Sequence, residues 1–186
     1  LEAAQVYQKA LQAGLSETVH ADLFAQTHLN LGAVYAAVPA RAAGDALKMA
    51  LAVQSFRAAL AVSPPETHPE RWAAAQLNLA NALQYTPSAH PRENLEQAVG
   101  LYDEVLRVRP RAADPVGYAR ALASRGNALA HLGRFGEALE NLNEAHKLFH
   151  WYNEADSAAT VLDLVDRIAH RRAELANESP GDESPV

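Results

Sequence analysis

The sequence predicts an all-α fold of about eight helices, arranged as an α-solenoid of antiparallel helix hairpins. Three observations support this fold class. Apolar residues recur at helical spacing along the 186 residues, and no segment shows the alternation of a β-strand. The ten prolines lie between the periodic segments or at their first residues. A helix-pair pattern also recurs, and such pairs stack because one pair cannot bury its apolar face alone.

The first part of the chain should form three helices, over residues 2–13, 16–37 and 44–62. Their expected apolar positions include Val6, Tyr7, Val19 and Leu23, which occur at helical spacing. The expected ends are set by turn-forming residues, with Gly14 as a C-cap, Pro39 as a stop, and the pair Pro64-Pro65 after the third helix.

The rest of the chain should form five more helices, over residues 69–85, 91–108, 114–132, 135–150 and 153–176. Pro69 suits the first position of a helix, and Gly133 marks a tight turn. The tail 177–186 is acidic and rich in Ser and Pro, so we expect it to be disordered. The predicted domain is 1–176, with repeats at 17–65, 66–112 and 113–150 and a capping helix at 153–176.

The repeat is defined by segments that align at nearly constant spacing. Leu29-Asn30-Leu31-Gly32 aligns with residues 77–80, a shift of 48, and residues 123–126 follow after a further 46. Small residues recur where two helices should approach closely, at Gly32, Ala80 and Gly126. Large residues of the second helices should fill the adjacent space, at Phe56, Tyr102 and Leu142. We interpret the aligned aromatics Phe24, Trp72 and Tyr118 as packing residues.

These positions resemble the tetratricopeptide repeat family, most clearly in the third copy, through Gly126, Leu129, Gly133, Phe135, Ala138, Leu142 and Ala145. The resemblance implies a right-handed solenoid whose first helices line a concave, peptide-binding face. The pattern departs from the family period of about 34 residues, because the first two copies carry roughly six to eight extra residues between their helices. Residues 72–79 particularly resemble long-helix repeats of bacterial multi-domain signalling proteins. The helix at 2–13 looks like the second half of a repeat, and the last helix looks like a cap or another first half.

By their position in the first helices, nine residues are candidates for the concave face: Gln26, Asn30, Ala33, Asn78, Asn81, Tyr85, Arg120, Asn127 and His131. Asparagine has low helix propensity, so its repeated use suggests a role beyond helix formation. Its amide can hydrogen-bond an extended peptide backbone as donor and acceptor. Alternatively, Asn30 and Asn78 bond neighbouring backbone groups or bond across the repeat interface.

Several function classes are disfavoured by the sequence. The chain has no cysteine, and it lacks a Gly-rich phosphate loop and a nucleophile elbow, so we expect neither catalysis nor a cofactor. The net charge of −6 disfavours nucleic-acid binding. The cluster Arg107, Arg109 and Arg111 is interpreted as a solvated helix end. The absence of a signal-like or membrane-spanning segment leads us to expect a cytoplasmic protein.

The leading hypothesis is a scaffold that binds a protein or peptide partner through the helices at 17–38, 69–85 and 114–132. One alternative is a regulatory or self-assembly segment of a larger multi-domain protein, with homo-oligomers formed through Leu1–Leu11 and the exposed solenoid ends. A lesser alternative is metal binding by His146 and His150, which are four residues apart on one helix face. A third ligand would have to come from elsewhere.

Overall fold

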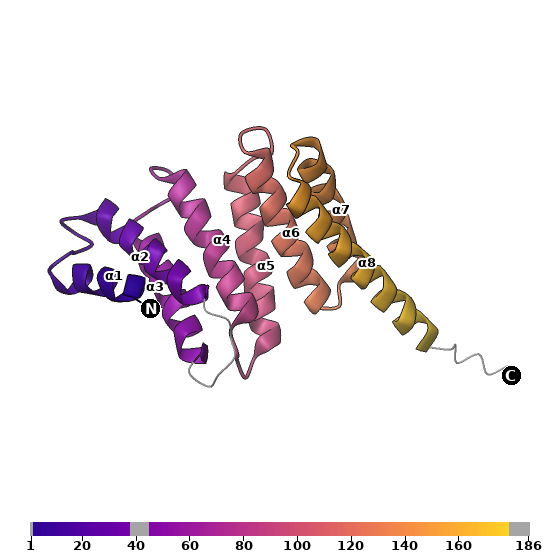
Figure 1. The fold of residues 1–186 in the computed structure, drawn as a ribbon, viewed down its shortest axis with the longest axis horizontal. Coiled ribbons are helices and arrows are strands. Elements are labelled where there is room, and N and C mark those ends of the chain that lie inside the picture. The colour runs from indigo at the N-terminus through magenta and orange to yellow at the C-terminus, as the bar shows by residue number, and fades with distance from the viewer. Residues whose placement is uncertain (1, 38–44, 179–186) are drawn as a thin grey trace, which may run out of the picture. The chain divides into compact units, whose positions relative to one another are not determined.

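The computed structural model describes residues 2–37 and 45–178, which form eight α-helices and contain no strand (Figure 1). The predicted all-α class is therefore confirmed for these residues. The expected stop at Pro39 and the tail from residue 179 lie outside them. The helices are α1 (Glu2–Gln12), α2 (Ala21–Ala36), α3 (Asp45–Ala61), α4 (Pro69–Tyr85), α5 (Pro91–Val108), α6 (Pro115–His131), α7 (Phe135–Trp151) and α8 (Ala155–Glu178).

The helix boundaries agree with the sequence prediction to within a few residues, with one larger difference. Helix α4 has the predicted bounds, and α8 ends two residues later than expected. Helix α2 begins at Ala21 rather than Ser16. The Ser16 side chain explains the difference, because its hydroxyl accepts a hydrogen bond from Val19 N at 3.3 Å and holds a turn there.

The chain divides into two compact units, Leu1–Asp114 and Pro115–Val186. In the first unit, α1 packs on α2, α2 on α3, α3 on α4, and α4 on α5. In the second unit, α7 packs on both α6 and α8, and α6 touches α8 more lightly. Consecutive helices thus form the main contacts in both units.

The predicted close approaches are confirmed at two of the three small residues. A Cβ added at Gly32 would lie 2.6 Å from the nearest ring atom of Phe56, and one at Gly126 would lie 2.8 Å from Leu142 Cγ. Phe56 and Leu142 are fully buried. These glycines therefore let helix pairs α2–α3 and α6–α7 pack closer than any side chain would allow.

Helix entry follows the same geometry in all three repeats. A backbone N–H donates to the carbonyl four residues earlier, just before each first helix. The three bonds are His20 N to Ser16 O (3.0 Å), His68 N to Pro64 O (3.0 Å) and Asp114 N to Pro110 O (3.3 Å). Their spacings of 48 and 46 residues match those of the sequence repeat. The repetition thus extends from the sequence to the backbone.

The turns that end α6 and α7 also share one geometry. Gly133 and Asn153 have positive φ values of 79° and 58°. The next residue donates to a carbonyl five positions back, Arg134 N to Leu129 O and Glu154 N to Phe149 O, both at 2.9 Å. This is the Schellman motif, in which a left-handed residue satisfies the last helical carbonyls. Sequence analysis identified the turn at Gly133 but not the one at Asn153.

Candidate functional site

The second unit contains an open groove between α6 and α8, which we call the α6–α8 groove. Its hollow has a volume of about 300 Å³. Helix α6 contributes Ala123, Ser124 and Asn127, and helix α8 contributes Thr160, Val161, Leu164 and Arg167. Asn127 belongs to the predicted concave set. The groove therefore brings a predicted site residue together with four side chains from the last helix, which was predicted as a cap or as another first half and for which no site residue was named.

The position of Asn127 follows from the way α6 buries its other side. Ala119, Leu122 and Leu129 are buried in α6, and Gly126 lies against Leu142 of α7. Asn127 is one residue beyond Gly126, so it turns away from α7 by about 100°. Because α6 packs against α7 through Gly126, the side of α6 that carries Asn127 faces the groove.

The groove combines an apolar floor with hydrogen-bonding groups. Val161 is buried and Leu164 half-buried, so both offer hydrocarbon surface. Arg167 Nε lies 3.0 Å from Asp163 Oδ2, with side chains that are 67% and 70% exposed. An ion pair this exposed contributes only about 0–1 kcal/mol, so the guanidinium can exchange Asp163 for a ligand carboxylate or carbonyl at little cost. The Asn127 amide supplies both a donor and an acceptor.

The other predicted residues of α6 lie along the same side of the helix but outside the hollow. Arg120 is seven residues before Asn127, and its Nη2 is 3.9 Å from Glu154 Oε2. His131 is the last residue of α6 and is exposed. These two side chains are thus positioned to extend the groove toward either end of α6.

The predicted residues of the first unit lie on α2 and α4 and are largely engaged with each other or with the core. Gln26 Nε2 donates to Asn30 Oδ1 at 3.1 Å within α2. Asn78 is half-buried, and Tyr85 is 58% exposed. Asn81 Oδ1 accepts a hydrogen bond of 2.7 Å from the hydroxyl of Tyr102. Bonding across a helix interface was considered for Asn30 and Asn78, and in the structure it is Asn81 that makes such a bond.

The N-terminal parts of α2 and α4 are joined by an electrostatic contact that sequence analysis missed. Asp22 Oδ1 accepts from Arg71 Nη1 at 2.7 Å and lies 3.2 Å from His68 Nε2. The hydrogen bond from Arg71 holds the pKa of Asp22 below its ordinary value, and the charges of Arg71 and His68 act in the same direction. The 49-residue separation of Asp22 and Arg71 explains why no local pattern indicated this contact.

The arginine cluster at the end of α5 includes one structural residue. Arg109 was expected to be solvated, but its side chain is only 14% exposed. Its Nη2 lies 2.8 Å from Glu70 Oε2, and its Nε lies 3.2 Å from Asp114 Oδ2. Because α4 and α5 pack together, the Arg109 side chain at the end of α5 reaches the start of α4. It therefore links the end of α5 both to α4 and to the turn that follows α5.

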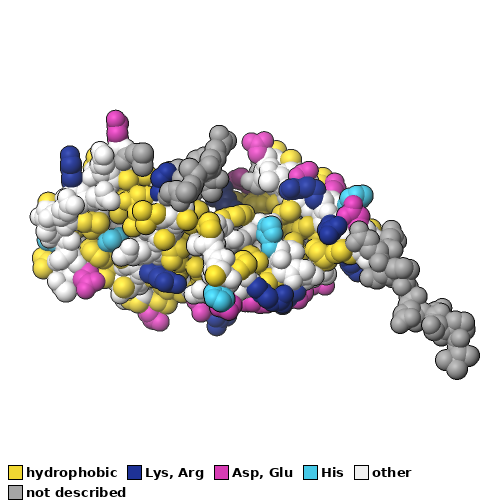
Figure 2. All heavy atoms as spheres, turned by 90° about the horizontal axis from the view of Figure 1, so that it is seen from below, with side chains coloured by type: hydrophobic (Ala, Val, Ile, Leu, Met, Phe, Trp, Pro, Cys, Tyr) yellow, Lys and Arg dark blue, Asp and Glu magenta, His cyan; other side chains and the backbone are white. Residues whose placement is uncertain are grey.

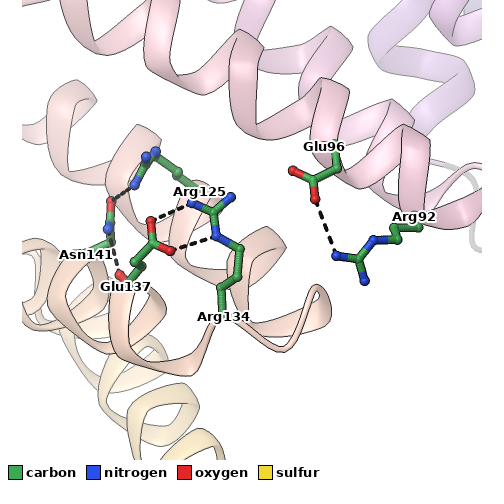
Figure 3. A network of polar contacts seen from close by, with 6 residues as sticks. All are labelled: Arg92, Glu96, Arg125, Arg134, Glu137 and Asn141. Atoms are coloured by element: carbon green, nitrogen blue, oxygen red, sulfur yellow. Dashed lines mark hydrogen bonds and ion pairs between the residues drawn. The ribbon is translucent and has the colours of Figure 1, made fainter.

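A polar network links α6 to α7 (Figure 3). Arg134 makes two hydrogen bonds, of 2.7 and 2.6 Å, to the Glu137 carboxylate, which lowers the pKa of Glu137. Arg125 Nη1 donates to Asn141 Oδ1 at 3.1 Å, and Asn141 Nδ2 donates to the Glu137 carbonyl at 2.7 Å. Figure 3 also shows the exposed pair Arg92–Glu96 of α5. The network fixes the interface between α6 and α7.

The two histidines proposed as metal ligands lie side by side on α7. The rings of His146 and His150 stack with centroids 6.4 Å apart and planes inclined by 20°. Within residues 2–37 and 45–178, no group of three or more His, Asp or Glu side chains is arranged to hold a metal ion. The metal hypothesis therefore lacks a third ligand in the described structure.

Sequence reasoning missed Ser124, Thr160, Leu164 and Arg167 as groove residues. The signal for Ser124 was available, because the 46-residue shift that relates the second and third repeats carries Asn78 to position 124. The three α8 residues follow from the same logic only if α8 is treated as another first helix instead of a cap.

Comparisons with known proteins add no family assignment. The sequence matches no protein-family model, and a search of curated proteins finds none with significant similarity. No helix in the described part of the chain has the length and apolar character needed to span a membrane.

Proposed function

We propose that this chain is a non-enzymatic interaction module of the tetratricopeptide type, which binds an extended peptide segment along the first helices of its repeats. The α6–α8 groove carries this proposal, because it combines a hollow of about 300 Å³ with Asn127, Ser124 and Arg167 at its rim. The volume is at the lower end of the range of ligand sites, about 300–1,000 Å³, and suits one or two side chains of a peptide.

The repeated packing supports the solenoid part of the proposal. Two helix pairs use a glycine against a buried large residue, and three first helices begin with the same backbone turn. In a right-handed solenoid of antiparallel hairpins, such units stack with the first helices on the inner face. Under this arrangement α2, α4, α6 and α8 each present a polar stripe to the ligand.

The binding chemistry follows from the groove. Ala123, Val161 and Leu164 would take an apolar side chain of the peptide, while the Asn127 amide bonds its backbone. Both helices are packed against α7, so little of the protein has to be ordered on binding. We place this module in the cytoplasm, as expected from the sequence.

The test is selection of peptides from a displayed random library, followed by affinity measurement with groove variants. Ala123→Trp should fill the hollow and abolish binding. Asn127→Ala should weaken binding about threefold to tenfold, the equivalent of one hydrogen bond of about 0.5–1.5 kcal/mol. The matched control is Asn143→Ala, which removes an exposed amide from α7 outside the groove. Peptides that bind Ala123→Trp as well as the parent chain would place the site elsewhere.

Asn81→Ala with Arg120→Ala tests whether the site extends beyond the groove. Because Asn81 also accepts from Tyr102, its replacement can weaken the α4–α5 packing. Tyr102→Phe removes the same hydrogen bond without touching the ligand face, so it is the control. If binding is lost in the Asn81 variant but retained in Tyr102→Phe, Asn81 contacts the ligand.

A further inference from the structure

The first unit contains a hollow bordered by α3, the end of α4 and the start of α5, which we call the α3–α5 hollow. Its volume is about 400 Å³. Gln54 and Arg57 line it from α3, and Leu83 lines it from α4. Ser88 of the turn after α4 and Asn94 of α5 complete the part of the wall that concerns us. All of these residues belong to the unit Leu1–Asp114.

The floor of the hollow is apolar. Val53 of α3 and Leu83 of α4 are buried side chains that still line it, and the exposed Ala50 adds a methyl group one turn before Val53 and Gln54. A ligand that covers this hydrocarbon surface removes it from water and gains free energy in proportion to the area. The floor therefore favours a ligand with an aliphatic part.

The rim of the hollow carries polar groups that the protein itself does not use. The side chains of Gln54, Arg57 and Asn94 make no hydrogen bond or ion pair with any residue that the structure describes. Arg57 offers five N–H donors in a planar fork, and each amide offers two more. None of the described lining residues is acidic. A cation with further donors beside it and no counterion favours an anion, and the fork of arginine suits the two oxygens of a carboxylate.

The turn after α4 holds its part of the rim in place. Thr86 Oγ1 donates to Ala82 O at 2.6 Å, and Ser88 Oγ accepts from His90 N at 3.0 Å. Because the Ser88 oxygen acts as the acceptor in this bond, its hydroxyl hydrogen is available to donate to a ligand. The turn is thus formed before a ligand arrives, so little of it has to be ordered on binding.

The repeat indicates that the packing of the helices does not require the polar residues of α3. The shift of 46 that relates the first two repeats carries Gln54 to Gly100 and Arg57 to Asp103. The same shift leaves a buried valine at positions 53 and 99. The packing position is therefore kept, whereas the guanidinium is replaced by the opposite charge. A ligand in the α3–α5 hollow accounts for the amide and the guanidinium in the first repeat.

We propose that the α3–α5 hollow is a second binding site, which takes a small organic carboxylate with an aliphatic body. The carboxylate accepts hydrogen bonds from Arg57 and Asn94, and the aliphatic body covers Val53 and Leu83. Small-molecule sites typically have volumes of about 300–1,000 Å³ and a mainly apolar lining with a few convergent polar groups. This site goes beyond the proposed peptide binding, because α3 and α5 are second helices of their repeats.

The combination of groups distinguishes this site from the rest of the surface. Charged and hydrophobic side chains also lie beside each other on the face of the molecule shown in Figure 2. Such neighbours alone do not define a ligand. In the α3–α5 hollow, however, an apolar floor, an unpaired guanidinium and two unpaired amides come from two helices and line one concave space.

An NMR titration of the isotopically labelled chain with acetate, hexanoate and hexanamide tests the proposal. Hexanoate should shift the signals of the Asn94 side-chain amide and of Val53 and Leu83. It should bind at least about tenfold more tightly than acetate, because each CH₂ group that is buried strengthens binding about threefold to fourfold. Hexanamide has the same shape without the charge, and it should bind at least about tenfold more weakly than hexanoate.

Three variants locate the site. Arg57→Gln removes the charge at an exposed position and should weaken hexanoate binding at least about tenfold. Ala50→Trp places a large side chain in the hollow from an exposed position and should abolish binding. Arg107→Gln is the matched control, because Arg107 is an exposed arginine of α5 that does not line the hollow. Its affinity for hexanoate should equal that of the parent chain. Circular dichroism shows whether each variant is folded.

Four results would overturn the proposal. Hexanoate could leave the signals of the lining residues unshifted, hexanamide could bind as tightly as hexanoate, or Arg57→Gln could bind hexanoate like the parent chain. The fourth uses N-acetyl-leucine, which resembles the end of a peptide. If it binds more than about tenfold more tightly than hexanoate, the occupant is a peptide C-terminus instead of a small ligand. None of these results bears on the α6–α8 groove, which belongs to the other unit.

Discussion

The close packing at Gly32 provides the sharpest test of how the helix pairs are built. Replacing Gly32 with alanine adds a Cβ that would lie 2.6, 2.8 and 2.9 Å from three ring atoms of Phe56. The Phe56 side chain is 1% exposed, so its ring has no room to turn toward solvent. Gly100 of α5 is the matched control, because a Cβ added there meets no atom within 4 Å.

Both substitutions raise the helix propensity of the chain, but only Gly32→Ala also crowds the core. Alanine stabilises a helix interior by about 1 kcal/mol relative to glycine at both positions. At Gly32 the added methyl also overpacks the core, which typically costs about 1–3 kcal/mol. We therefore expect Gly100→Ala to raise the free energy of unfolding by about 0.5–1 kcal/mol. The free energy of unfolding of Gly32→Ala should be about 1–3 kcal/mol lower than that of Gly100→Ala.

Urea denaturation followed by circular dichroism measures this difference, since both positions belong to the unit Leu1–Asp114. Phe56→Leu supplies a second check, because leucine is the residue that faces Gly126 in the α6–α7 pair. Gly32→Ala should be less harmful in the Phe56→Leu background than in the parent chain. If Gly32→Ala proves as stable as Gly100→Ala, the close approach of α2 and α3 is not the reason for the glycine.

Three further predictions concern polar groups. Tyr102→Phe should lower the free energy of unfolding by about 0.5–1.5 kcal/mol in the same assay, because Asn81 loses its hydrogen-bond donor. Burial holds the pKa of His28 below its ordinary value of 6.5, so the unfolded chain binds the proton more readily. Stability should therefore fall as the pH drops below about 6.5, and His28→Gln should lack that component of the pH profile. An NMR titration should give Asp22 a pKa below 3.8, and Arg71→Gln should raise it.

The helices were predictable because the signals that define them are local. Pro69 and Tyr85 bound α4 as expected, and the glycine–aromatic pairing of Gly32 with Phe56 followed from aligning one repeat on another. The start of α2 was misplaced because the Ser16 hydroxyl competes for the backbone and holds a turn. That bond depends on the exact backbone path, which propensity does not resolve.

The exposed apolar residues show where periodicity alone is insufficient. Val6, Val19 and Leu23 were expected among the apolar positions of their helices, yet they are 64%, 74% and 59% exposed. Helical spacing identifies residues on one face but does not say whether a neighbouring helix covers that face. Val6 is an example, because no helix in the described part of the chain covers it.

The candidate site was predicted only in part because its two walls come from different repeats. Asn127 was found by its position in a first helix, whereas Arg167 depends on α8 having the same role. Long-range ion pairs such as that of Arg71 with Asp22 were not predictable. The partners are 49 residues apart in the sequence, and either side chain could equally have faced solvent. Asn81 is a predicted ligand-binding residue with a structural role. Its amide oxygen accepts a hydrogen bond from the hydroxyl of the buried Tyr102.

The repeat register accounts for the composition of the α6–α8 groove. Position 126 must stay small because Leu142 fills the space beside it, whereas position 127 lines the groove and carries the Asn127 amide. Carried forward by 40 residues, position 127 becomes Arg167, which lines the groove from the α8 side. The same position of two helices therefore supplies an amide and a guanidinium to one hollow.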